Sequence, residues 1–202
     1  MRILNYKNWA RETIPPIAAY VALDIALTLI LFAISPESVK IGTLRPVSTI
    51  PPKLFQLALA GLAVGLIASI TFRKLDLNLI LLGVAFVALL DVDHLPSMLG
   101  KDQPIRPAHS FLFLAILLLV LAFTAKKQPW VELIAVSAFC AHLASDTGGF
   151  AFFMPCSFTY TSIDRYRVPF ALGAVTFALL AGYAKHRKYL KQKQVPKSVV
   201  LN

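Results

Sequence analysis

Six long apolar segments constrain the fold of this 202-residue chain more than any other feature of its sequence. They lie at about 17–34, 54–72, 77–90, 110–125, 129–145 and 168–184. Hydrophobic residues make up 57% of the chain and charged residues only 15%, which is too apolar for an ordinary soluble domain. Because roughly 20 apolar residues cross a bilayer as a helix, the pattern predicts an all-α, polytopic membrane helical bundle with about six transmembrane helices.

The charges between these segments predict a topology. Thirteen of the 20 Lys and Arg residues lie in the N-terminal stretch, the second and fourth loops and the C-terminal stretch. The positive-inside rule then places both termini in the cytoplasm and the third and fifth loops outside. We expect a cytoplasmic or interfacial N-terminus (1–16), a single transmembrane domain (17–184) and a basic cytoplasmic tail (185–202), in a multi-pass protein of the cell membrane.

The net charge of +10 raises the question of a partner. The basic residues sit in short stretches between apolar runs, which is typical of topology signals and of contact with anionic lipid. We therefore expect a membrane and no nucleic acid as partner. Trp9, Trp130 and Tyr183 lie near segment ends, where aromatic side chains anchor helices at the membrane interface.

Ionisable residues of the apolar region gather in three short clusters. These are Asp91-Val92-Asp93-His94, Arg106-Pro107-Ala108-His109-Ser110 and His142-Leu143-Ala144-Ser145-Asp146. Taken alone, the first resembles a helix cap and the third a structural His–Asp hydrogen bond. Together they predict a divalent-metal site, because His and Asp are common ligands and their unpaired burial in lipid is costly. The candidate ligands are Asp91, Asp93, His94, His109, His142 and Asp146, enough for one or two ions of zinc or manganese.

Helix depth links the three clusters. Asp91 lies roughly 21 Å along the third segment, and His142 lies roughly 20 Å along the fifth, at 1.5 Å per residue. His109 lies roughly 24 Å from the cytoplasmic end of the fourth segment, which runs in the opposite direction. His142 and Asp146 are four residues apart and share a helix face. The clusters are therefore predicted to meet at one level, in the outer part of an apolar core about 30 Å thick.

The remaining residues of the clusters suggest roles in catalysis. Arg106 can hold a phosphate or carboxylate in bidentate fashion, so we expect it to bind substrate and to act in catalysis. Ser110 is a candidate substrate-binding or supporting donor beside His109. An aspartate that is not fully used as a ligand, Asp93 or Asp146, is the candidate proton acceptor.

At these residues the chain resembles the membrane-bound metal-dependent hydrolase family, also called YdjM-like, whose bacterial members are described as LexA-regulated inner-membrane hydrolases. The family pattern is D-x-D-H, then an Arg and a T-H-S-like element, then H-x-x-x-D followed by Thr and Gly, then Pro. The match covers roughly 91–155, from Asp91 to Pro155. Pro107 and Ala108 depart from the Gly and Thr of that pattern. The resemblance implies a divalent-metal hydrolase.

The leading functional hypothesis is an integral-membrane hydrolase in which metal-activated water attacks a phosphoester of a lipid or amphiphile that enters at the outer-leaflet level. A second enzyme hypothesis is a metal-independent lipid phosphatase of the type-2 phosphatidic acid phosphatase kind, which Lys101, Arg106 and Pro107 with His142 and Asp146 echo. The chain lacks the P-S-G-H element of those enzymes. The non-enzyme alternative is a metal-binding membrane protein or transporter.

Overall fold

The computed structural model describes residues 6–34, 50–72, 75–91, 106–125, 128–146, 149–150, 152–153 and 161–194. Six α-helices make up most of this part of the chain: α1 (Tyr6–Ile34), α2 (Ile50–Phe72), α3 (Leu77–Leu89), α5 (Phe111–Thr124), α6 (Pro129–Ser145) and α7 (Arg167–Gln194). The 3-10 turn η4 (Pro107–His109) precedes α5, and η5 (Ile163–Tyr166) precedes α7. The two-residue strands β1 (Gly149–Phe150) and β2 (Thr161–Ser162) pair antiparallel.

The helical fold class is confirmed, and the predicted segments match the helices at different precision. The bounds of α3, α5 and α6 agree with the apolar runs to within a residue or so. In contrast, α1 begins at Tyr6 instead of near 17, and α7 continues to Gln194 instead of ending near 184. The end of α7 is rich in Lys, Arg, Leu and Gln, which are strong helix formers. The helix therefore continues beyond its apolar residues. The short pairing of β1 with β2 was not predicted.

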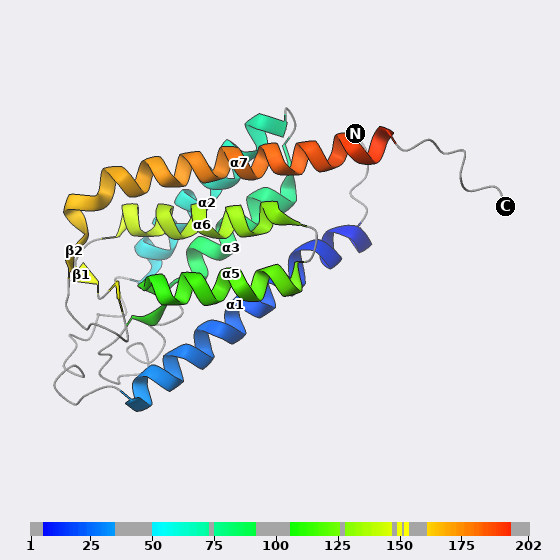
Figure 1. The fold of residues 1–202 in the computed structure, drawn as a ribbon. Coiled ribbons are helices and arrows are strands. Elements are labelled where there is room, and N and C mark those ends of the chain that lie inside the picture. The colour runs from blue at the N-terminus through cyan, green and yellow to red at the C-terminus, as the bar shows by residue number, and fades with distance from the viewer. Residues whose placement is uncertain are drawn as a thin grey trace.

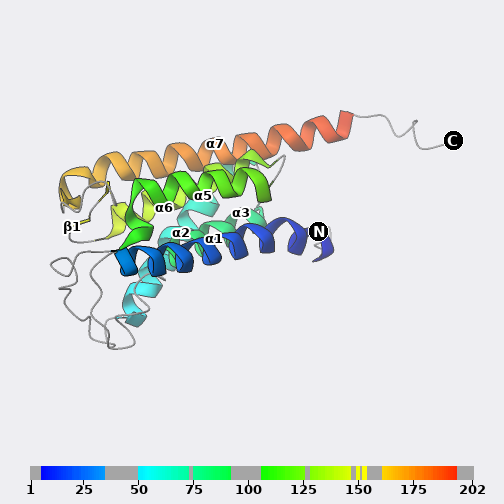
Figure 2. The ribbon, with the colours of Figure 1, turned by 60° about the horizontal axis from the view of Figure 1, so that its bottom comes forward.

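The helices form a bundle around one core. Helix α6 packs along α7, α2 packs against α3 and α7, and α1 lies across α3 and α5. The first turns of α1 and the last turns of α7 lie at the same end of the bundle (Figures 1 and 2). The beginning of α5 and the strand β1 lie at the other end (Figure 1). The bundle therefore has two distinct ends, which are separated by the length of its helices.

Glycines bring α2 close to its neighbours. Gly61 and Gly65, four residues apart, lie on the face of α2 that meets α3, where a Cβ at either position would overlap the α3 backbone at Val84 or Ile80. Gly83 of α3 faces the same contact from the other side. Small residues at this spacing allow helix backbones to approach closely, and tight packing replaces the hydrophobic driving force within lipid. The contact fixes α3, which ends beside Asp91.

Beside its apolar core, the bundle buries several ionisable side chains and exposes many large apolar ones. Asp24, His109, His142 and Asp146 are fully buried, whereas large apolar side chains lie on the outside, such as Ile70 and Val168, which are 70% and 69% exposed. A large number of exposed apolar side chains is expected where a surface contacts lipid or another protein.

By length and composition, one helical stretch of the described residues, Ile163–Lys191, is long and apolar enough to cross a membrane. The described chain also contains four shorter apolar helical stretches, at Phe55–Thr71, Leu77–Leu89, Phe111–Thr124 and Pro129–Ser145. Six membrane passages, and the domain limits at 17 and 184, stay predictions.

The packing of α7 on α2 predicts the effect of a single added methyl group. A Cβ at Gly182 would overlap the carbonyl oxygen of Ala68, a backbone atom that cannot move aside alone. We expect Gly182→Ala to destabilise the protein by about 1–3 kcal/mol, measured as a lower unfolding midpoint in detergent. Gly173→Ala, on the same helix, is the control, since its new methyl group would meet only the side chain of Cys140, at 3.2 Å. Equal loss of stability in both variants would contradict this packing.

Candidate metal centre

Four of the predicted ligands meet at one end of the bundle because three helical elements end or begin there. Asp91 follows Leu90, the C-terminal cap of α3, and His109 is the last residue of η4. His142 lies in the last turn of α6, and Asp146 caps the C-terminus of that helix. One ligand atom of each side chain lies within 4.8 Å of all the others, and all four residues are buried. Segments distant in sequence thus supply one compact donor set.

The spacing of these donors fits a single divalent ion. The Nε2 atoms of His109 and His142 are 2.9 Å apart. The Nε2 atom of His142 is 3.4 Å from Oδ1 of Asp91 and 3.9 Å from Oδ2 of Asp146. The Nε2 atom of His109 is 4.0 Å from Oδ1 of Asp91 and 3.5 Å from Oδ2 of Asp146. Ligands about 2.0–2.1 Å from a tetrahedral ion lie about 3.3 Å from each other. The five separations given above, from 2.9 to 4.0 Å, bracket this value, and no pair of the four atoms is more than 4.8 Å apart, so the donors would draw together around such an ion.

A backbone contact sets the tautomer of His142. Its Nδ1 atom lies 3.0 Å from the carbonyl oxygen of Val87. A carbonyl only accepts, so Nδ1 carries the donated proton and the neutral ring keeps a lone pair on Nε2, the atom that faces the other donors. The Val87 carbonyl is available because α3 ends two residues later and the N–H of Asp91 bonds instead to Ala88. Such support is typical of histidines that bind metals.

Arg106 joins the two carboxylates. Its Nη1 donates to Oδ2 of Asp146 at 3.0 Å, and its Nη2 donates to Oδ1 of Asp91 at 3.2 Å. The Arg106 side chain is 14% exposed, more than the side chains of the four candidate ligands. The Nη2 atom of Arg167, at the start of α7, donates to the backbone oxygen of Asp146 at 3.2 Å. Two arginines therefore hold Asp146 in place, one through its side chain and one through its backbone.

The structure places the other predicted site residues as follows. Asp93 and His94 lie outside the described residues. Ser110 is buried at the N-terminal cap of α5, where its hydroxyl oxygen accepts a hydrogen bond from the N–H of Phe113 at 3.1 Å. This contact begins α5 directly after His109, so Ser110 helps to position that histidine. Its contact with substrate stays a prediction.

Sequence reasoning missed three supporting groups. The carbonyl of Val87 leaves no sequence signal, because any residue type has one. Gln56 donates from Nε2 to the backbone oxygen of Ser145 at 3.0 Å, and its signal was an amide side chain in the apolar part of α2. Arg167 was counted only as a topology charge. All three act on the end of α6 or on the histidine within it.

Comparison with known families finds a match that covers the part of the chain that holds this site. A family model described as YdjM inner membrane protein matches residues 55–199. The chain belongs to the YdjM inner membrane protein family. The predicted resemblance is therefore confirmed, and the YdjM match extends over α3, α5, α6 and α7, which carry or adjoin the donor set. No curated protein and no solved structure matches the chain.

The donor set predicts that metal content depends on the four buried side chains. Purified protein is expected to carry a divalent metal ion, measured by elemental analysis. His142→Ala and Asp91→Ala each remove one donor of four, and we expect at least a tenfold loss of affinity, comparable with or larger than that caused by loss of a supporting contact. His186→Ala, a histidine of α7 outside the cluster, is the control and should retain the ion. Full metal content in both cluster variants would exclude this site.

Proposed function

We propose that this YdjM-family protein is a membrane hydrolase that depends on a divalent metal and acts on a phosphoester of a lipid-like substrate. One observation carries the proposal: four buried donor atoms at metal-binding spacing share their two carboxylates with a partly exposed arginine. Ion pairs alone seldom bring two histidines and two aspartates together in an apolar core, because each buried charge costs desolvation energy. The arrangement is typical of a site built for a cation and an anion together.

The charges favour an anionic substrate. Asp91 and Asp146 carry two negative charges, which one divalent ion would neutralise, and the guanidinium of Arg106 would then be left as the excess positive charge. A phosphoester carries the opposite charge and presents paired oxygens that a guanidinium binds with two parallel hydrogen bonds. Since Arg106 is the most exposed member of the group, an anion that reaches the cluster meets it directly.

Different residues of the chain would bind the metal ion, accept a proton and orient the substrate. A bound zinc or manganese ion would supply Lewis-acid activation of water and of a phosphoryl oxygen. Asp91, His109, His142 and Asp146 would hold that ion, with Asp93 and His94 as further candidates for a second ion. Asp146 or Asp93 would accept the proton of the attacking water, and Arg106 would orient the phosphoryl group.

We further propose six membrane passages, with both termini in the cytoplasm and the cluster facing outward. Support comes from the apolar exterior of the bundle and from the shared end of α1 and α7, which an even number of passages requires (Figure 1). The basic residues of the last turns of α7, from Lys185 to Lys193, lie at that end, and the metal cluster lies at the opposite end beside Arg167. An amphiphilic substrate entering from the bilayer suits a site at this depth.

Activity should depend on metal and on Arg106. We expect purified protein to hydrolyse a phosphoester from a screen of lipid and soluble substrates, and a strong chelator to abolish the activity. Arg106→Ala should lower kcat/KM about a hundredfold, whereas Arg106→Lys should lose less because it keeps the charge but not the bidentate geometry. Arg165→Ala removes an exposed arginine of η5 and is the matched control, with unchanged activity.

Two experimental outcomes would contradict this proposal and favour another function. Hydrolysis that survives full removal of metal would favour the type-2 phosphatidic acid phosphatase chemistry, in which a histidine acts as nucleophile. Metal uptake into proteoliposomes without hydrolysis of any phosphoester would favour a transporter. Both experiments use the same purified protein and the same Arg106 variants.

A further inference from the structure

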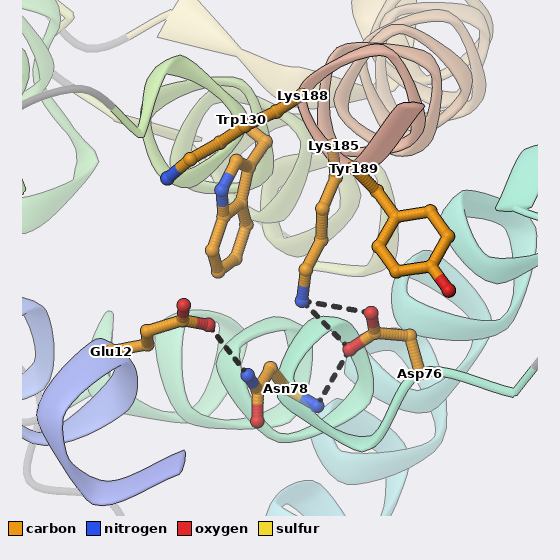
Figure 3. Close-up of a pocket in the computed structure, with 7 residues that line it drawn as sticks. All are labelled: Glu12, Asp76, Asn78, Trp130, Lys185, Lys188 and Tyr189. Carbon is orange, nitrogen blue, oxygen red and sulfur yellow. Dashed lines mark hydrogen bonds and ion pairs between the residues drawn. The ribbon is translucent and has the colours of Figure 1, made fainter. Parts of the chain in front are cut away.

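A second polar site lies at the other end of the bundle. A pocket of about 240 Å³ is lined by side chains from the first turns of α1, α3 and α6 and from the last turns of α7 (Figure 3). Asp76 of this pocket precedes Asp91 by the length of α3, roughly 22 Å, and Trp130 precedes His142 by roughly 18 Å along α6. The pocket is therefore separate from the metal cluster.

One wall of the pocket is held by a partly buried ion pair. The Nζ atom of Lys185 lies 2.8 Å from each carboxylate oxygen of Asp76 and 4.2 Å from the centre of the Trp130 ring. Asp76 also accepts hydrogen bonds from the N–H groups of Asn78 and Leu79, so it caps α3. Lys185 and Asp76 thus satisfy each other and join α7 to the start of α3. Because this pair is already engaged, the contacts to a ligand would come from the other side chains that line the pocket.

Two opposite charges remain for a ligand. Figure 3 shows Lys185 on one side of the Trp130 indole, with the ammonium of Lys188 and the carboxylate of Glu12 on the other. Lys188 makes no hydrogen bond or ion pair to any residue that the structure describes. Oε2 of Glu12 accepts one hydrogen bond, from Nδ2 of Asn78 at 3.0 Å, and a carboxylate can accept several more. The lining of the pocket therefore includes both a cation and an anion.

The position of the pocket indicates where its ligand comes from. On α7, exposed apolar residues such as Leu179 and Leu180 and the exposed ring of Tyr183 are followed by a mainly basic stretch. It contains Lys185, Arg187, Lys188 and Lys191, with Leu190 as an exposed apolar residue among them. This change from apolar to basic surface is typical of a helix leaving the acyl region at the head groups. In the membrane-embedded bundle proposed above, the pocket, which Lys185 and Lys188 line, would therefore lie at head-group level.

We propose that this pocket binds the head group of a zwitterionic phospholipid with a primary amine, of the phosphatidylethanolamine class. Lys188 binds the phosphate through a charge-assisted hydrogen bond, and Glu12 accepts hydrogen bonds from the ammonium group. A phosphatidylglycerol head group fits less well, because it carries no cation to neutralise the Glu12 carboxylate. A choline head group lacks the N–H donors that Glu12 needs. The lipid is held here without being hydrolysed.

Fluorescence of Trp130 tests the proposal in the full-length chain. The sequence contains two tryptophans, so Trp9→Phe leaves Trp130 as the sole reporter in the pocket wall. Short-chain phosphatidylethanolamine added to the protein in detergent should change its emission saturably. Phosphatidylcholine and phosphatidylglycerol should require at least about tenfold higher concentrations. Native mass spectrometry of the unmodified chain should show a retained phosphatidylethanolamine, independently of the reporter variant.

Matched variants separate recognition from general charge. Lys188→Gln and Glu12→Gln should each weaken phosphatidylethanolamine binding about tenfold, the usual loss for one charge-assisted contact. Lys191→Gln removes the same charge from an exposed position of α7 and should have no effect. Metal content should stay unchanged in all three variants, which separates this site from the proposed hydrolase site.

Three results would overturn the proposal. Equal weakening by Lys191→Gln would mean that the basic end of α7 attracts lipid without a specific pocket. Equal binding of phosphatidylglycerol, unaffected by Glu12→Gln, would remove the amine contact. Free phosphoethanolamine that binds as tightly as the lipid would make the ligand a soluble compound instead of a membrane component.

Discussion

The burial of four ionisable side chains in an apolar bundle is the constraint on which the rest of this structure depends. A charged or polar group without a partner in such surroundings costs several kcal/mol, so each must find others at the same depth. The ends of α3, η4 and α6 converge for this reason, and Arg106 joins the two carboxylates there. The glycine contact of α2 with α3 and the cap of α5 at Ser110 then hold those ends in register.

Much of the fold could be predicted because a helix ends where its apolar run ends whenever a polar loop follows. This holds for α3, α5 and α6, whose ends are marked by charged or proline-containing loops. It fails for α1 and α7, where the backbone stays helical after the apolar residues stop. Trp130 shows a related error: it lies near a segment end, as an interfacial anchor does, but it is only 1% exposed and packs beneath Lys185.

The donor set could be predicted in part because helix geometry converts sequence position into depth. Counting along three segments was enough to bring Asp91, His109 and His142 to one level, and Asp146 follows from its four-residue spacing. The contacts that orient these side chains could not be predicted. The carbonyl of Val87, the two carboxylates spanned by Arg106 and the meeting of Lys185 with Asp76 depend on how helices distant in sequence are rotated about their axes.

The shortness of the helices around the metal cluster has a consequence for the surrounding membrane. Helix α3 has 13 residues and α5 has 14, so each is only about 20 Å long, roughly 10 Å less than the acyl core of a typical bilayer. In the proposed membrane-embedded state, this hydrophobic mismatch would thin the adjacent leaflet. Lipid head groups and water would then descend toward the cluster, and a phosphoester could reach Arg106 without leaving the plane of its own leaflet.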